Sequence, residues 1–183
     1  LAGDLDRYAE LVERYRSAAW KIALGFVHNR EDAKELSQNG FVKAYQQLRR
    51  FRGEAKFSTW LYRIIANECK DFLRRKARAP RTVSLSPETD SEEPVLFEVA
   101  DPSLNPSESM SQRELAKTMT HAIGRLPMKQ QTAFVLRHIN GLSIEEVSQI
   151  MGSRPGTVKS HLFRATEALR IVMEPFMEQE VLR

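Results

Sequence analysis

Apolar residues recur every three or four positions in two separate stretches of the chain, which is the spacing of one face of an α-helix. In the first stretch this spacing predicts helices at residues 4–27, 30–50 and 58–78, with turns at Asn29 and Gly53. In the second stretch it predicts helices at residues 109–125, 127–139, 143–151 and 155–172. Neither stretch shows the strict alternation of a half-buried strand, so the predicted fold class is all-α.

The segment between the two stretches, residues 83–112, lacks this periodicity. It holds four prolines, seven acidic residues and no lysine or arginine. Its few apolar side chains cannot offset the entropy lost on ordering, so a flexible acidic linker is predicted. We therefore expect two small helical domains, at residues 1–82 and 113–183, joined by this linker. The alternative is that its apolar residues, Val95, Leu96, Phe97 and Val99, dock the segment on another surface.

Charge is segregated along the same three parts. The net charge of +4 over 183 residues divides into +8 for residues 1–82, −7 for residues 83–112 and +3 for residues 113–183. Two basic blocks separated by an acidic spacer are typical of a protein that meets a polyanion at two places.

Composition excludes several classes of protein. Cys69 is the only cysteine, which rules out an internal disulfide and a site with several thiolate ligands, and we expect it in the core. The histidines show no metal-ligand spacing and no Gly-rich phosphate loop is present, so we expect no enzymatic activity, no metal and no cofactor. No run approaches the roughly 18 apolar residues of a membrane helix, and no signal peptide is visible, so we expect a cytoplasmic protein without membrane insertion.

Residues 142–170 carry the most informative pattern. Ser143 and Glu146 have the spacing of a capping box at the start of a helix, and Pro155 suits the first turn of the next one. The turn between them, residues 152–155, contains glycine. In the second helix a buried stripe is predicted at Val158, Leu162, Ala165, Leu169 and Val172.

The opposite face of that second helix is basic and hydroxylic. It carries Gly156, Lys159, Ser160, Phe163, Arg164 and Glu167. Cations and hydroxyls reach phosphates or base edges, and Phe163 can pack against a thymine methyl group or a sugar. A short helix, a glycine turn and a basic second helix are typical of the helix-turn-helix that enters the major groove of DNA. The alternative is a structural helical hairpin with a solvated basic face.

The predicted helix at residues 58–78 has a basic stripe opposite its apolar face. The stripe consists of Arg63, Asn67, Lys70 and Arg74. Such a row suits a phosphate backbone. Phe57, Trp60 and Tyr62 cluster at the start of the helix, and aromatic rings beside cations hold the unstacked bases of single strands. Taken alone, the stripe is better explained as an ordinary solvated face, and a packed corner of the core would use the same aromatic residues.

The predicted helix at residues 30–50 presents a polar face with little net charge. This face consists of Glu35, Gln38, Asn39, Val42, Gln46 and Arg49. Such a surface suits a protein partner better than DNA, although an ordinary surface helix has the same composition.

The chain resembles the extracytoplasmic-function (ECF) sigma factors of bacterial RNA polymerase, of the sigma-70 family. The resemblance is carried by EDAKELSQNGFVKAYQQLRRFRG, FSTWLYRIIANECKDFLRRKAR and LPMKQQTAFVLRHINGLSIEEVSQIMGSRPGTVKSHLFRATEAL, which cover both predicted domains. It implies sigma region 2 at residues 1–82 and region 4 at residues 113–183. It further implies promoter selection and melting as the function, in a stress or envelope-signal response. The implied partners are promoter DNA, an anti-sigma factor, and core RNA polymerase through its beta-prime clamp helices and beta flap.

The resemblance also assigns roles to individual residues. For binding polymerase it implies Glu35, Gln38, Asn39, Val42, Gln46 and Arg49. For the minus-ten promoter element it implies Phe57, Trp60, Arg63, Asn67, Lys70 and Arg74. For the minus-thirty-five element it implies Arg154, Thr157, Lys159, Ser160, Phe163 and Arg164.

Several residues depart from the family pattern. Ser37 stands where an apolar residue is usual, and Asn39, followed by Gly40, stands where an acidic residue is usual, so we expect altered polymerase affinity or helix rigidity. His161 replaces a common arginine and Thr166-Glu167 replace residues that are often basic, so we expect altered phosphate contacts or promoter choice. The chain starts at Leu1, and we expect a trimmed N-terminus.

Two other classes of function remain open from the residues. A stand-alone helix-turn-helix regulator would dimerise and bind duplex DNA without polymerase. A purely protein-binding helical module, such as a scaffold or a sigma antagonist, would tolerate the loss of Arg164.

Overall fold

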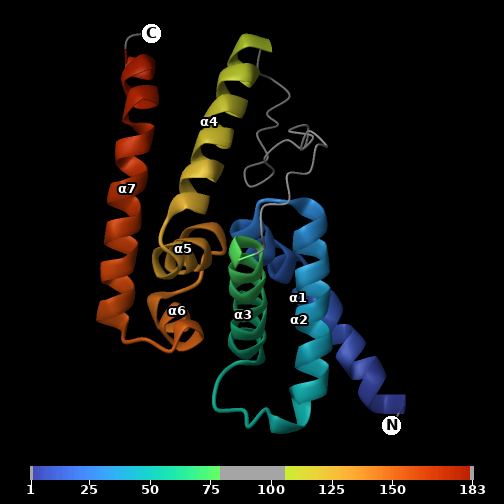
Figure 1. Ribbon diagram of the computed structural model, residues 1–183. Coiled ribbons are helices and arrows are strands. Elements are labelled where there is room, and N and C mark those ends of the chain that lie inside the picture. The colour runs from blue at the N-terminus through green and yellow to red at the C-terminus, as the bar shows by residue number, and fades with distance from the viewer. Residues whose placement is uncertain (1, 79–105, 182–183) are drawn as a thin grey trace.

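The computed structural model of the protein describes residues 2–78 and 106–181, and the regular structure in these ranges is helical (Figure 1). The N-terminal unit contains α1 (Ala2–Val27), α2 (Arg30–Gln47), the 3-10 turn η1 (Leu48–Arg50) and α3 (Phe57–Arg78). The C-terminal unit contains α4 (Pro106–Arg125), α5 (Met128–Phe134), the π turn η2 (Val135–Ile139), α6 (Ile144–Met151) and α7 (Pro155–Val181). The all-α prediction is confirmed.

The helices of the N-terminal unit pack against one another around an apolar core. Ile22 and Phe26 of α1 and Ile65 of α3 are at most 1% exposed. The Tyr8 hydroxyl donates a hydrogen bond to the Phe41 carbonyl at 2.6 Å and so ties α1 to α2. Burial raises the pKa of Tyr8 to about 12, which keeps this donor protonated.

A tight turn joins α1 to α2. The Asn29 side chain accepts a hydrogen bond from the Asp32 backbone N–H at 2.9 Å, which pairs a donor that the start of α2 would otherwise leave open. His28, one residue earlier, has a φ of 57°, in the left-handed region that side-chain-bearing residues rarely adopt. The predicted turn is thus confirmed, and its backbone orients His28 toward the rest of the molecule.

The C-terminal unit contains the predicted helix-turn-helix, formed by α6 and α7. The Glu146 backbone N–H donates to Ser143 Oγ at 3.1 Å, and the Ser143 N–H donates to the Glu146 carboxylate at 3.0 Å. The predicted capping box is therefore confirmed. Gly152 ends α6 with a φ of 60°, a conformation that glycine adopts without strain, and this lets α7 begin at Pro155.

The buried stripe of α7 agrees with the prediction except at its end. Val158, Leu162, Ala165 and Leu169 are at most 9% exposed. The prediction for Val172 was wrong, because it is 43% exposed while Met173 is 7% exposed. Both positions lie one turn beyond Leu169, so the spacing alone did not distinguish them.

Several helix boundaries differ from the predictions. The helix predicted at residues 127–139 changes to a π turn at Val135, where the Asn140 side chain donates to the Val135 carbonyl at 2.9 Å. The helix predicted at residues 30–50 tightens into η1 over its last turn. α4 begins at Pro106, so the final part of the predicted linker at 83–112 is helical. The rest of that linker, up to residue 105, lies outside the described residues.

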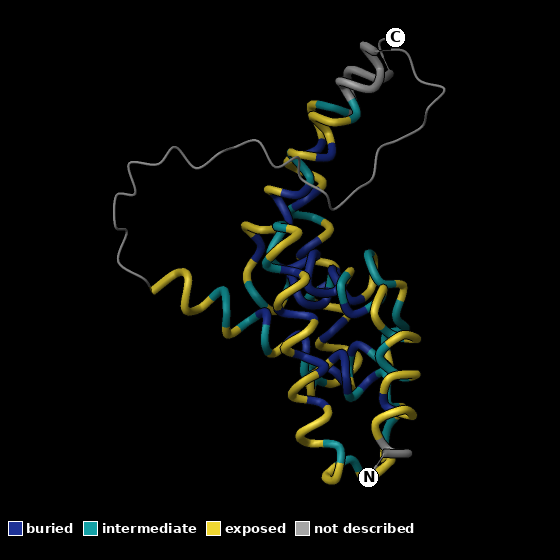
Figure 2. The backbone as a smooth tube through the Cα atoms, turned by 90° about the vertical axis from the view of Figure 1, so that its right-hand side faces the viewer, coloured by how far each residue is buried: buried dark blue, intermediate teal, exposed yellow. Residues whose placement is uncertain are grey.

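The two units pack directly on each other. α1 contacts η2, α3 contacts α6, and the buried side chains of both units form one continuous apolar cluster, which Figure 2 shows as the dark-blue centre of the molecule. We call this contact the interdomain joint. Within it, Val135 is fully buried against Gly25, where an added methyl group would lie 2.6 Å from Val135 Cγ1. Glycine at position 25 is therefore what permits this close approach.

Candidate nucleic-acid and polymerase interfaces

The face of α7 that was predicted to meet duplex DNA is open to solvent. Its candidate residues are all exposed: Arg154, Thr157, Lys159, Ser160, Phe163 and Arg164. Phe163 is 69% exposed, although the helix behind it is anchored by the buried stripe. A ring that projects from a rigid helix among cations exposes apolar surface that a partner could cover. The geometry therefore fits entry into a groove of DNA, and the roles of the individual residues stay predictions.

His161 lies beside this face as a partly buried residue. Burial lowers its pKa, and the nearby cations Lys129 and Arg164 lower it further. The neutral form of the imidazole is thereby favoured over the charged form, so His161 does not replace the positive charge of the arginine that is common in the family. Of the other two departures, Thr166 is exposed, and Glu167 pairs with Arg170 at 3.5 Å.

The basic stripe of α3 lies on one side of the helix, as the spacing predicted. Arg63, Asn67 and Arg74 are exposed, and Lys70 is half-buried between them. Burial lowers the pKa of Lys70, and the neighbouring Arg74 and Arg63 lower it further. A bound phosphate would stabilise cations that repel one another in this way, because an anion favours the charged form of each side chain.

Rings from three segments form what we call the aromatic cluster, at the start of α3. The cluster consists of Tyr15, Phe51, Phe57, Trp60 and Tyr62. Trp60 lies 5.1 Å from Phe51 and 5.7 Å from Phe57 between ring centroids, within the range of favourable aromatic pairing. Both rings predicted to act on DNA, Phe57 and Trp60, are partly buried against the core and partly exposed. Part of each ring therefore packs in a corner of the core, as the alternative interpretation predicted, and the exposed part of each ring is available to a base.

The predicted polymerase-binding face of α2 is also exposed over its whole length. Glu35, Gln38, Asn39, Val42, Gln46 and Arg49 all face solvent. Val42 is 56% exposed and lies in the middle of the face, where it offers an apolar contact among polar groups. In the described residues α2 packs on α1 and α3, so the C-terminal unit does not cover this face.

The family departure at Ser37 belongs to the core of the N-terminal unit, as does Gly40, which follows the departure at Asn39. Ser37 is buried and its hydroxyl donates to the Lys34 carbonyl at 2.9 Å, which satisfies the polar atom. Gly40 is buried where α2 crosses α3. The departure at Asn39, in contrast, lies on the exposed face.

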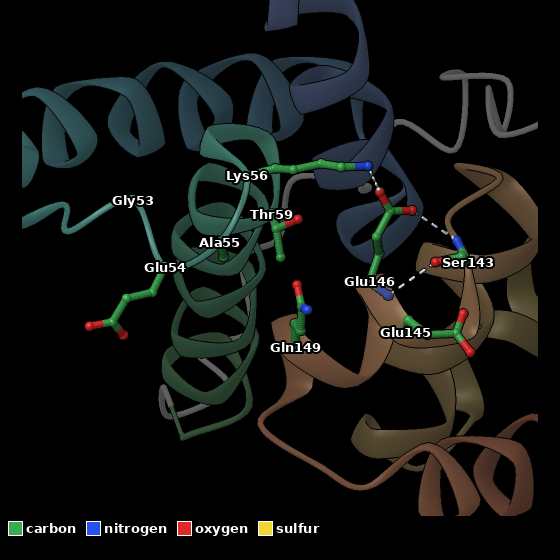
Figure 3. Close-up of a pocket in the computed structure, with 9 residues that line it drawn as sticks. All are labelled: Gly53, Glu54, Ala55, Lys56, Thr59, Ser143, Glu145, Glu146 and Gln149. Carbon is green, nitrogen blue, oxygen red and sulfur yellow. Dashed lines mark hydrogen bonds and ion pairs between the residues drawn. The ribbon is translucent and has the colours of Figure 1, made fainter.

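A cleft between the start of α3 and the start of α6 was not predicted from the sequence (Figure 3). It has a volume of about 830 Å³ and is lined on one side by Lys56 and Thr59 and on the other by Glu146 and Gln149. Lys56 Nζ lies 3.1 Å from the Glu146 carboxylate. The Ser143 backbone N–H and then the Lys56 ammonium hold the pKa of Glu146 below its ordinary value. Lys56 and Glu146 are 90 positions apart, and no sequence pattern relates them.

The described residues do not form a metal-binding site. Among residues 2–78 and 106–181, no group of three or more His, Cys, Asp or Glu side chains is placed to hold a metal ion. Cys69 is fully buried, as predicted, and burial raises the pKa of its thiol to about 12. None of the helices described is long and apolar enough to span a bilayer.

Comparison with known proteins matches both units. The model of Sigma-70 region 2 matches residues 11–79, and that of Sigma-70, region 4 matches residues 116–169. The chain is 34% identical to the RNA polymerase sigma-H factor of Pseudomonas aeruginosa, covering 97% of this chain and 91% of that protein. It is also 34% identical to the ECF RNA polymerase sigma-E factor of Haemophilus influenzae, covering 96% of this chain and 92% of that protein.

Two solved structures share the fold. One is the sigma factor RpoE in complex with the anti-sigma factor NepR from Bartonella quintana, with a TM-score of 0.67, 22% identity and coverage of 92% of this chain and 97% of that one. The other is CnrH in complex with the cytosolic domain of CnrY, with a TM-score of 0.67, 21% identity and coverage of 95% and 92%. The two helical units thus match regions 2 and 4 in order, and the identity to sigma factors extends over nearly the whole chain. The chain therefore belongs to the ECF sigma factors of the sigma-70 family.

Proposed function

We propose that this chain is a promoter-selecting subunit of RNA polymerase, which directs the core enzyme to its promoters and begins strand opening. The observation that carries the proposal is that three separate faces, on α2, α3 and α7, are exposed together while the side chains behind them form the core. Their chemistry differs, because the α2 face has little net charge and the other two are basic.

Region 4 (α4 to α7) would read the minus-thirty-five element. α7 would lie in the major groove, where Lys159 and Arg164 reach phosphates or guanine edges and Phe163 covers a thymine methyl group. The exposed position of Phe163, on a helix anchored by four buried residues, supports the assignment of α7 to the minus-thirty-five element. Arg154 and Thr157, in the first turn, would contact the backbone.

Region 2 (α1 to α3) would capture the minus-ten element as a single strand. The basic stripe of α3 would track the backbone, and the exposed parts of the Phe57 and Trp60 rings would stack with bases that leave the duplex. Unstacking a base costs a few kcal/mol, and contacts of this kind can offset that cost without ATP.

The α2 face would bind the clamp helices of the beta-prime subunit. A second polymerase contact, to the beta flap, would use the apolar groove of about 370 Å³ between α4 and α7, which is lined by Ala122, Leu126 and Leu169. We further propose that the protein works in the cytoplasm, in a stress or envelope-signal response, under the control of an anti-sigma factor. The complexes of RpoE and CnrH with such partners support the last point by analogy.

Run-off transcription with core RNA polymerase on a promoter library tests the proposal. We expect the chain to confer initiation at a defined set of promoters that core polymerase alone does not use. DNA binding by the chain alone, undiminished without polymerase, would favour a stand-alone regulator. Unchanged transcription by the Arg164→Ala variant would favour a protein-binding module.

A further inference from the structure

The basic surface of α7 continues onto α5. The two helices pack against each other (Figure 1), and the groove between α4 and α7 is also lined by Leu126 and Pro127, which directly precede α5, beside Ala168 of α7. His161 lies on the same side of α7 as Ala168, two turns away, so it stands at the border with α5. Lys129, in the first turn of α5, is exposed and lies close enough to His161 to act on it electrostatically.

The His161 ring presents one of its two nitrogens to the surface. Nδ1 is enclosed and has no hydrogen-bond partner among the described residues, whereas the residue as a whole is only partly buried. Since Nδ1 has no acceptor for a proton, the neutral ring carries its proton on Nε2. The N–H donor of His161 therefore lies at the outer edge of the ring, where an incoming acceptor can reach it.

Two cations flank this donor. In the described part of the chain, neither Lys129 nor Arg164 belongs to an ion pair, although Arg170 on the next turns of α7 pairs with Glu167 and Glu174. A phosphate group suits such a place, because its unesterified oxygens can accept from an N–H donor and pair with a cation at the same time.

We propose that Lys129 and His161 together bind one backbone phosphate of promoter DNA, so that the duplex-contact surface of region 4 extends from α7 onto α5. This inference rests on the proposed function in one respect, namely that α7 lies in the major groove of the minus-thirty-five element. With α7 in that groove, the sugar-phosphate backbone that borders the groove runs along the side of the helix. The contact adds affinity and fixes the position of α7, and it reads no base.

Lys129→Gln tests the lysine. Its side chain is exposed, so the variant should keep its fold, which thermal melting checks. Holoenzyme affinity for a promoter from the run-off selection should fall about fivefold, the upper end for an exposed ion pair. The slope of log affinity against log salt concentration should become shallower by about one. Lys117→Gln removes an equally exposed charge on α4 and is the matched control, which should change neither value.

The loss in Lys129→Gln should also be independent of base sequence. It should be equal at matched and mismatched minus-thirty-five elements, because a phosphate contact does not discriminate bases. Neutral methylphosphonates, placed one at a time along the backbone beside this element, identify the phosphate. At one position the parent should lose about fivefold in affinity while Lys129→Gln loses nothing further, since the contact is already absent.

His161→Gln tests the imidazole. The charged groups that act on the ring are Lys129 of α5 and Arg164 of α7. A bound phosphate favours the protonated ring, so the complex takes up protons and the affinity of the parent should rise as the pH falls from about 7.5 to about 6. Glutamine keeps a neutral N–H donor and does not titrate, so this variant should keep most of the affinity at the higher pH and lose the rise.

Several outcomes would overturn the proposal while leaving the proposed function intact. They are equal affinities of Lys129→Gln and Lys117→Gln, equal methylphosphonate losses in the parent and Lys129→Gln at every position, and an unchanged pH profile in His161→Gln. In each of these cases the parent holoenzyme still binds its promoters. Failure of the parent holoenzyme to bind any promoter would instead contradict the proposed function, and this contact with it.

Discussion

Gly40 of α2 lies directly against Ile65 of α3, such that a methyl group added at position 40 would stand 2.5 Å from Ile65 Cγ1. Two helices can approach this closely only where one of them lacks a side chain. Gly40 is thus a packing feature of region 2, and it positions the helix that carries the polymerase-binding face relative to the helix that carries the basic stripe.

Gly40→Ala should destabilise region 2. Ile65 is fully buried, so overpacking by the added methyl group should lower the free energy of unfolding by about 1–3 kcal/mol. Urea denaturation followed by circular dichroism measures the loss. Gly156→Ala is the matched control, because nothing lies within 4 Å of the added methyl group there, and its stability should be unchanged or slightly higher. Equal stability of both variants would contradict the packing argument.

Arg164→Ala and Phe163→Ala should weaken use of the minus-thirty-five element. Each removes a contact that projects from the exposed face of α7, and loss of one such contact costs about 1–3 kcal/mol. Promoter binding by the holoenzyme, measured by filter binding or fluorescence, should fall about tenfold or more. Arg170→Ala is the control of equal charge change, because Arg170 pairs with Glu167 and Glu174. If Arg164→Ala and Arg170→Ala lose the same amount, the loss at Arg164 reflects net charge and not a specific contact.

Arg63→Ala and Asn67→Ala should impair strand opening more than initial binding. Both side chains are exposed on the α3 stripe, and the arginine contributes a phosphate contact whose loss reduces the salt dependence of binding by about one. Permanganate reactivity of unpaired thymines in the holoenzyme complex reports the opening. Arg75→Ala changes an equally exposed arginine outside the stripe and should leave opening intact.

Val42→Glu should weaken assembly with core polymerase without loss of fold. Val42 is 56% exposed, so its replacement leaves the core intact, whereas a charge at the centre of an interface is costly to desolvate. Competition for core polymerase measures affinity, and thermal melting confirms stability. Gln47→Glu introduces the same charge on an exposed position away from the face. Equal effects of the two variants would argue against a specific interface on α2.

Acid should open the interdomain joint. Burial, with a smaller contribution from the nearby His121 on α4, lowers the pKa of His28 from 6.5 to about 4. The closed state then binds fewer protons than the open state, so its stability is full above pH 6.5 and falls as the pH drops from 6.5 toward about 4. The loss is bounded by roughly 1.4 kcal/mol for each pH unit in that window.

Energy transfer between dyes on cysteines introduced at the exposed positions Lys34 and Lys117, one in each unit, measures the opening across that pH range. His28→Asn is the informative variant, because asparagine tolerates the left-handed backbone at this turn and does not titrate. Opening should become less dependent on pH in this variant. An unchanged pH profile would assign the effect to other groups.

The individual helices and their faces were predictable because each depends on local sequence. Ser143 and Glu146 specify a helix start three positions apart, and the basic stripe of α3 follows from helical spacing alone. Val172 was predicted wrongly because two neighbouring positions, 172 and 173, continue the apolar stripe equally well, and only the packing partner distinguishes them. The π turn at Val135 was likewise invisible, since it depends on hydrogen bonds that bypass the usual helical spacing.

The interdomain joint was beyond sequence reasoning for a different reason. In the sequence, Gly25 is only a weak helix former within an apolar helix, and Val135 is one more apolar residue of a predicted core. Their contact joins segments on either side of the linker. Periodicity shows that a helix face is buried, but it does not show which other element packs against that face. The same holds for His28, whose burial between the two regions has no local signal.

The uncovered α2 face has a consequence for how a cell would share out its transcription machinery. A chain that presents Val42 and its neighbours in this way would compete with other initiation subunits for a limited supply of the core enzyme. Its abundance alone would then divert enzyme away from housekeeping genes, even before a single promoter of its own is opened.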